Sequence, residues 1–141
     1  MAELRLFNFT QQLLELSMRV RGMRHAILTA NIANVDTPGY KPKDIDFASI
    51  MNEAAEMDDA PVSREQQMEQ LLASPSDLQS RIYEPMLPDN QHGEDRLDRN
   101  SVGLDQQIAL LSENSLSFET SLTLLSRTLA KLRYVISEGR A

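Results

Sequence analysis

Apolar residues near the start of the chain recur in alternating steps of three and four positions, a repeat typical of a helix that packs along one stripe. The repeat ends just before Asn34, which is next in the same register. Its members are Leu6, Phe9, Leu13, Leu16, Val20, Met23, Ile27 and Ala30. The spacing predicts an N-terminal helix over residues 1–34 with an apolar seam for another helix.

The same repeat returns at the C-terminal end and predicts a second long helix over residues 105–141. Asp105 can cap its first turn, and Gly139 stands where a left-handed C-terminal cap is expected. The seam consists of Leu104, Ile108, Leu111, Ser115, Phe118, Leu122, Leu125, Leu129, Leu132 and Ile136. Further apolar residues outside this seam give the helix more apolar surface than one partner helix covers, namely Leu110, Leu116, Leu124 and Val135.

Residues 35–104 differ in composition from both ends. All six prolines lie between Pro38 and Pro88, and the stretch carries fifteen acidic and six basic residues, which accounts for the net charge of −7. Few large apolar side chains are present, so we expect an irregular, partly extended or disordered acidic middle segment, with long helices only at the two ends. A capping box of Ser63 and Gln66 would allow one short helix over residues 63–72. Residues 82–83 are expected to form a brief extended piece.

A sharp turn is predicted where the first helix ends, in residues 30–40 (ANIANVDTPGY). Pro38 presets φ for the first corner of a turn, and Gly39 can adopt the positive φ that a type II turn requires next. Pro42 keeps Lys41 out of helical geometry, so an extended exit through residues 44–47 is expected.

Candidate catalytic or metal-binding residues are sparse, and we predict no catalytic, metal or cofactor site. His25 falls on the outward side of the first heptad register, and His92 lies in the polar middle segment. Asp36, Asp44 and Asp46 lack the spacing of a calcium loop and are interpreted as solvated turn carboxylates.

Binding to nucleic acid or insertion into a membrane is not expected. Arg19, Arg21 and Arg24 form a small basic group, but the chain is acidic and has few aromatic residues, so a solvated helix face or ion pairs between subunits are the better interpretation. No stretch approaches the roughly 20 apolar residues of a membrane span, and the first nine residues lack a signal-peptide core. The absence of cysteine excludes disulfides.

The matched helices predict a mainly α fold in which the two ends pair like a coiled coil. A simple helical hairpin within one chain is a common solution for such helices. The middle segment of about seventy residues is far longer than the usual connection between paired helices. A functional insertion or a fold that depends on assembly is therefore favoured.

Residues 24–47 (RHAILTANIANVDTPGYKPKDIDF) resemble the N-terminal signature of the flagellar rod and hook proteins, the axial proteins of the bacterial flagellum, whose hallmark is ANxANxxTPGY. The DIDF ending and the short chain are similar to the proximal-rod members, and residues 100–136 are similar to their C-terminal helix. Residues 48–95 are unmatched. Arg99 departs from a usual glycine, and Gln106 with Gln107 departs from usual acidic residues.

The resemblance implies a structural protein of the proximal rod, exported unfolded by the flagellar type III apparatus without a cleaved signal peptide and polymerising across the periplasm. It implies as partners other copies of the chain, the rod proteins FlgC, FlgF and FlgG, and the basal-body adaptor FliE, with the export gate and the membrane ring as further candidates. One alternative from another class is a soluble coiled-coil adaptor or export chaperone. The other is a helical-bundle enzyme, which would need a buried pair of acidic or histidine residues, and the two seams contain no such pair.

Two sets of residues are predicted to carry assembly. The helix-packing seam is Leu13, Leu16, Val20, Met23 and Ile27 with Phe118, Leu122, Leu125, Leu129 and Leu132. By the family's pattern the elbow is Asn31, Asn34, Thr37, Pro38, Gly39 and Tyr40. Its asparagine amides are expected to satisfy backbone groups at the helix end or nearby.

Overall fold

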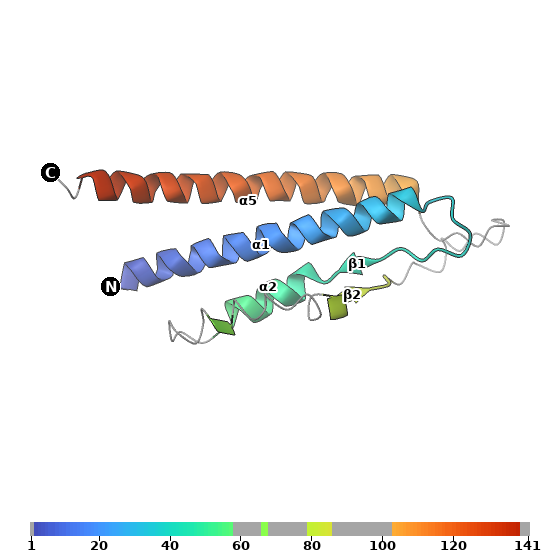
Figure 1. Ribbon diagram of the computed structural model, residues 1–141, viewed down its shortest axis with the longest axis horizontal. Helices are drawn as coiled ribbons and strands as arrows, with labels where there is room; N and C mark the ends of the chain where they lie inside the picture. Colours follow the sequence, from blue (N-terminus) through green and yellow to red (C-terminus); the bar gives the residue numbers. More distant parts are fainter. Residues whose placement is uncertain (1, 58–65, 68–78, 86–102, 139–141) are drawn as a thin grey trace.

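The computed structural model describes residues 2–57, 66–67, 79–85 and 103–138. Two long helices dominate it, α1 (Ala2–Ala33) and α5 (Leu104–Glu138), and they lie antiparallel side by side, with the two chain ends at the same end of the pair (Figure 1). The predicted mainly α fold with paired terminal helices is therefore confirmed. His92, Arg99 and Gly139 lie outside the described residues.

The turn after α1 has the predicted geometry. The Tyr40 amide donates to the Thr37 carbonyl at 3.2 Å, which closes a four-residue turn with Pro38 and Gly39 at its corners. Gly39 has φ +74°, so the predicted positive φ is confirmed and any side chain at this position would strain the backbone. The turn reverses the chain and sends it back along α1 (Figure 1).

After the turn the chain forms an arm, residues 44–57, which begins with an extended piece. Strand β1 (Asp44–Ile45) pairs antiparallel with β2 (Ile82–Tyr83), with Asp44 opposite Tyr83 and Ile45 opposite Ile82. The extended pieces expected at residues 44–45 and 82–83 are thus confirmed.

The expectation that extended structure continues through Phe47, with no helix directly after the elbow, is wrong. Most of the short helix allowed over residues 63–72 lies outside the described residues. Helix α2 (Phe47–Ala55) begins at Phe47, because the Asp46 carboxylate caps it by accepting from the Ser49 amide at 2.9 Å. Ile50 and Ala54 lie one turn apart on its buried face. Arg81, just before β2, forms an ion pair with Glu53 of this helix.

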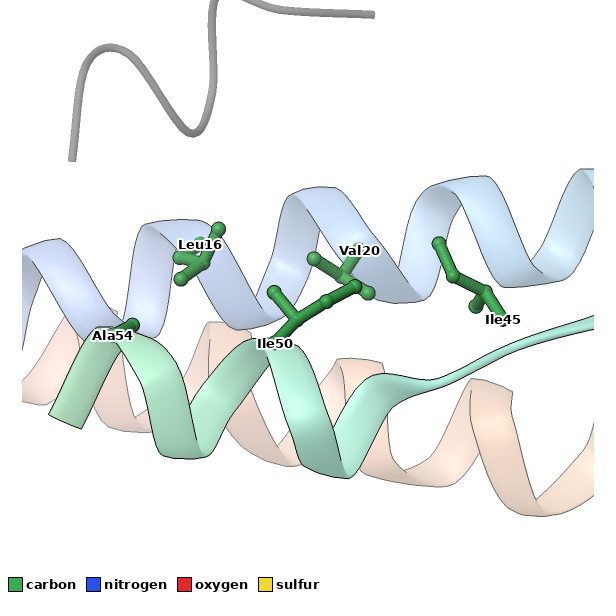
Figure 2. Packing of buried hydrophobic residues seen from close by; sticks show 5 residues of the cluster. All are labelled: Leu16, Val20, Ile45, Ile50 and Ala54. Carbon is green, nitrogen blue, oxygen red and sulfur yellow. The ribbon is translucent and has the colours of Figure 1, made fainter. Parts of the chain in front are cut away.

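The apolar core lies between α1 and the arm. Its buried residues are Leu16, Val20, Ile45, Ile50 and Ala54 (Figure 2). Half-buried side chains pack against them, namely Leu13, Met23, Ile27, Phe47, Met51 and Met57. Helix α1 is therefore the middle layer, with the arm on one side and α5 on the other (Figure 1). Within the described ranges, no helix has the length and apolar character needed to cross a membrane.

Candidate assembly site

Asn31, in the last turn of α1, joins three parts of the molecule. Its Nδ2 donates to the Lys43 carbonyl at 2.7 Å and to Gln107 Oε1 of α5 at 2.9 Å. Its Oδ1 accepts from the Tyr40 hydroxyl at 3.1 Å and from the Lys43 amide at 3.0 Å. Only 1 % of Asn31 is exposed, and both donors and both acceptor positions of its amide are used. One side chain on α1 thus connects the turn, the residue just before the arm and α5.

Asn34, three residues further on, bonds only within its own turn. Its Nδ2 donates to the Ala30 carbonyl at 2.8 Å, and its Oδ1 accepts from the Thr37 hydroxyl at 3.2 Å. The expectation that both asparagine amides satisfy nearby backbone groups is confirmed. The elbow residues therefore lie together, with Pro38 and Gly39 exposed at the tip of the turn, and their part in assembly stays a prediction.

The contact between α1 and α5 includes a line of buried polar side chains. On α5 these residues recur at steps of seven: Gln107, Asn114 and Ser121. Asn114 donates through Nδ2 to the Arg21 carbonyl at 2.9 Å, and the hydroxyl oxygens of Ser17 and Ser121 lie 3.5 Å apart. Sequence reasoning missed this line because it followed apolar residues only. The recurrence of polar residues every seven positions along α5 could have indicated this line from the sequence.

The predicted seam of α5 divides into two rows. One row is half-buried: Leu111, Phe118 and Leu125 each lie four positions after a member of the polar line, and Leu132 continues the row seven positions later. The other row is exposed: Leu104, Ile108, Leu122, Leu129 and Ile136. Leu116, Leu124 and Val135, outside the seam, are exposed as well. We call the five exposed seam residues the open apolar row of α5, whereas Leu116, Leu124 and Val135 project from other sides of the helix.

The predicted seam of α1 meets the arm. Leu16 and Val20 are fully buried and belong to the core with Ile45 and Ile50. Leu13, Met23 and Ile27 pack against the same core. The apolar face of α2 covers the α1 stripe, so the α1 half of the predicted seam faces the arm and not the α5 half. This arrangement was not foreseen from the sequence because α2 was not predicted.

Two arginines of α1, Arg21 and Arg24, also contact the arm. The Arg24 guanidinium donates to both carboxylate oxygens of Asp44, at 2.8 and 2.7 Å, and this hydrogen bonding raises the pKa of Arg24. Arg21 lies 4.1 Å over the ring of Phe47, and burial lowers its pKa. The interpretation of Asp44 as a solvated turn carboxylate is therefore wrong. Arg24 is likewise not a solvated cation or one that pairs between subunits, because the two side chains form a part-buried ion pair within the chain.

No metal centre is evident in the part of the chain that the structure describes, where no group of three or more histidine or acidic side chains could hold an ion. His25 is exposed on α1, as its register predicts.

The elbow held by Asn31 and the exposed apolar row of α5 characterise an elongated, mainly helical protein. The family model described as "Flagella basal body rod protein" matches residues 23–41, which span the elbow. FlgB, the flagellar basal body rod protein of Escherichia coli K12, is 35% identical over 87% of this chain and 89% of its own length. FlgB of Salmonella typhimurium is 34% identical with the same coverage. FlgB of Yersinia enterocolitica is 30% identical over 87% of this chain and 90% of its own.

The chain therefore belongs to the flagellar basal body rod proteins, and within them to the FlgB family. It is a structural component of the basal-body rod. These matches do not favour the soluble adaptor or export chaperone, and the relatives are rod proteins by name and not enzymes.

Proposed function

We propose that this rod protein polymerises through its terminal helices, with neighbouring subunits covering the open apolar row of α5, and so forms part of the hollow proximal rod. The observation that carries the proposal is the position of this row. Leu122, Leu129 and Ile136 are 44%, 45% and 56% exposed, on a helix whose contact with α1 includes buried polar side chains. Covering such side chains contributes about 1 kcal/mol each, roughly half the value for complete burial.

The shape of the unit favours an open array over a closed ring. The apolar row belongs to α5 alone, whereas the arm covers the corresponding stripe of α1. A neighbour that covers the row with a different surface makes a heterologous contact, and such contacts generate helical assemblies. Other copies of this chain, the rod proteins FlgC, FlgF and FlgG, and the adaptor FliE are the proposed neighbours, with the export gate and the membrane ring at the base.

Export in unfolded form agrees with the same arrangement. Most helical stability in proteins comes from the packing of an apolar face, and one apolar row of α5 is left exposed in the protomer. We therefore infer that α5 becomes fully ordered when neighbours cover it after export to the periplasm. A cleaved signal peptide is not part of this route.

The test is a double substitution in the open apolar row, Leu122→Glu with Leu129→Glu, in a strain that lacks its own copy of the gene. Both side chains are exposed, so we expect circular dichroism of the purified chain to be unchanged. Swimming and recovery of the chain in isolated basal bodies are expected to be lost, because charges on the row would be buried without partners.

A matched control is Ala48→Glu with Ala55→Glu, two exposed positions on α2. These charges lie on the arm, so incorporation into basal bodies should be retained. Normal incorporation of the α5 variant would refute the proposed contact, and absence of the unaltered chain from basal bodies would refute the function itself.

A further inference from the structure

The polar line of α5, which consists of Gln107, Asn114 and Ser121, meets α1 in a way that fits a single alignment of the two helices. Gln107 contacts Asn31 and Ser121 contacts Ser17, and these two contacts lie fourteen positions apart on each helix. Because α1 and α5 run antiparallel (Figure 1), the equal spacing means that both contacts belong to one axial register. Asn114 lies midway between them on α5.

The half-buried apolar row of α5 does not by itself select that register. Its members, Leu111, Phe118, Leu125 and Leu132, also repeat every seven positions. A shift of one heptad, about 10 Å along the axis, would therefore put another apolar residue of the row at most of the places now occupied, and apolar burial is not directional. The side chains of the polar line differ in length and kind, so the same shift would place an ill-fitting group opposite each partner on α1.

Asn114 indicates that the polar line is not explained by stability alone. Only 1 % of Asn114 is exposed, and its Nδ2 donates to the Arg21 carbonyl, while its Oδ1 has no hydrogen-bond partner among the residues that the structure describes. The Arg21 carbonyl lies inside α1, where the helical ladder already gives it an amide donor. Burying an unpaired acceptor is costly, so leucine, whose side chain has the same branched outline, would stabilise this contact at least as well.

Buried polar groups that add little stability are best known in paired helices for fixing the register. We propose that the polar line specifies the axial register of α5 on α1, and that Asn114 acts there through specificity and not through stability. A fixed register holds the open apolar row at one height relative to the elbow, so every copy of the chain presents the same surface. This inference concerns the protomer alone and goes beyond the proposed polymerisation.

The first test uses pairs of introduced cysteines as reporters of the register, because the chain has no cysteine of its own. Ser17→Cys with Ser121→Cys reports the observed register, since the two hydroxyl oxygens lie 3.5 Å apart. Ser17→Cys with Thr128→Cys, and Thr10→Cys with Ser121→Cys, report shifts of one heptad in the two directions. The equilibrium fraction of intrachain disulfide in a glutathione buffer measures how often each pair meets.

In the otherwise unaltered chain, we expect only the pair for the observed register to form a disulfide. Adding Gln107→Leu with Asn114→Leu should raise the disulfide fraction of at least one shifted pair by about tenfold or more. The matched control, Gln106→Leu with Glu113→Leu, adds two leucines one position earlier, on the exposed surface of α5, and should leave the fractions unchanged. Shifted pairs that stay reduced in the first variant, or that form equally in the control, would overturn the proposal.

The second test needs only Asn114→Leu, and it decides the question if the double variant fails to fold. We expect the midpoint of urea denaturation to equal or exceed that of the unaltered chain, because no other group loses its only partner. The disulfide fraction of a shifted pair should rise in the same variant. A lower midpoint, or an unchanged disulfide pattern, would show that Asn114 does not act through specificity and would overturn the proposal.

Discussion

Helices α1 and α5 have similar lengths and similar apolar repeats, yet they are covered very differently. The arm covers the apolar stripe of α1, and α5 lies against its other side (Figure 1). Helix α5 contacts α1 through a line that includes buried polar residues, and its apolar row stays open. The comparison teaches that the apolar stripe of α1 is covered within the protomer, whereas one apolar row of α5 is left exposed, and the proposed polymerisation would cover it.

The largest expected difference comes from the same substitution on each helix. Leu16→Ala removes a fully buried side chain from the α1 core and should lower the free energy of unfolding by about 3 kcal/mol. Leu122→Ala removes a 44% exposed side chain from α5, about half of which is covered in the protomer, and should lower it by only about 1 kcal/mol. Urea denaturation followed by circular dichroism measures both.

Incorporation into basal bodies should respond to the two substitutions in the opposite order, with Leu122→Ala reducing it more than Leu16→Ala. Leu122→Ala removes apolar area that neighbours are proposed to cover, so assembly should weaken more than with Leu16→Ala, although Leu122→Ala destabilises the monomer less. Equal losses of monomer stability from the two variants would show that α5 is as well covered as α1 and would remove the contrast between the helices.

The terminal helices and the elbow could be predicted because short-range rules determine them. The heptad repeats ran long enough to indicate helix, and Pro38 followed by Gly39 is specific for one turn type. The observed φ of +74° at Gly39 agrees with that reasoning. The hydrogen bonds of Asn34 within its own turn were foreseeable for the same reason.

The partners of each helix face could not be predicted, because they depend on contacts between distant residues. Asn31 reaches Gln107, which is 76 residues away along the chain, and nothing local to either residue indicates the other. Helix α2 was missed because its nine residues lie in a segment whose composition argued against helix. The sign that sequence reasoning overlooked was Asp46, an N-cap immediately before an apolar residue.

The next prediction concerns what joins α1 to its neighbours at the elbow. Asn31→Ala leaves Gln107 Oε1, the Lys43 backbone and the Tyr40 hydroxyl without their shared partner, so unfolding should become easier by about 2–3 kcal/mol. Asn34→Ala removes an amide of the same motif that bonds only within its turn, and should cost about 1 kcal/mol. Thermal and urea denaturation give both values.

Hydrogen exchange sharpens the test of Asn31. Loss of its link to α5 should increase exchange in the first turns of α5, near Gln107, as well as in the elbow. Loss of Asn34 should affect the elbow alone. Similar costs for the two variants, with no change in α5, would mean that the elbow does not couple the two helices.

The smallest expected effect concerns the ion pair that holds the arm on α1. Arg24 contacts both oxygens of Asp44 with side-chain exposures of 18% and 10%, and lysine cannot reproduce that paired geometry, so Arg24→Lys should cost about 1 kcal/mol. Lys41 pairs with Glu84 at 70% and 52% exposure, and Lys41→Gln should change stability by less than about 0.5 kcal/mol. Denaturation at low and high salt distinguishes them, since salt screens the exposed pair more. Equal, salt-sensitive losses would show that the arm is held loosely and that its core contacts alone cover α1.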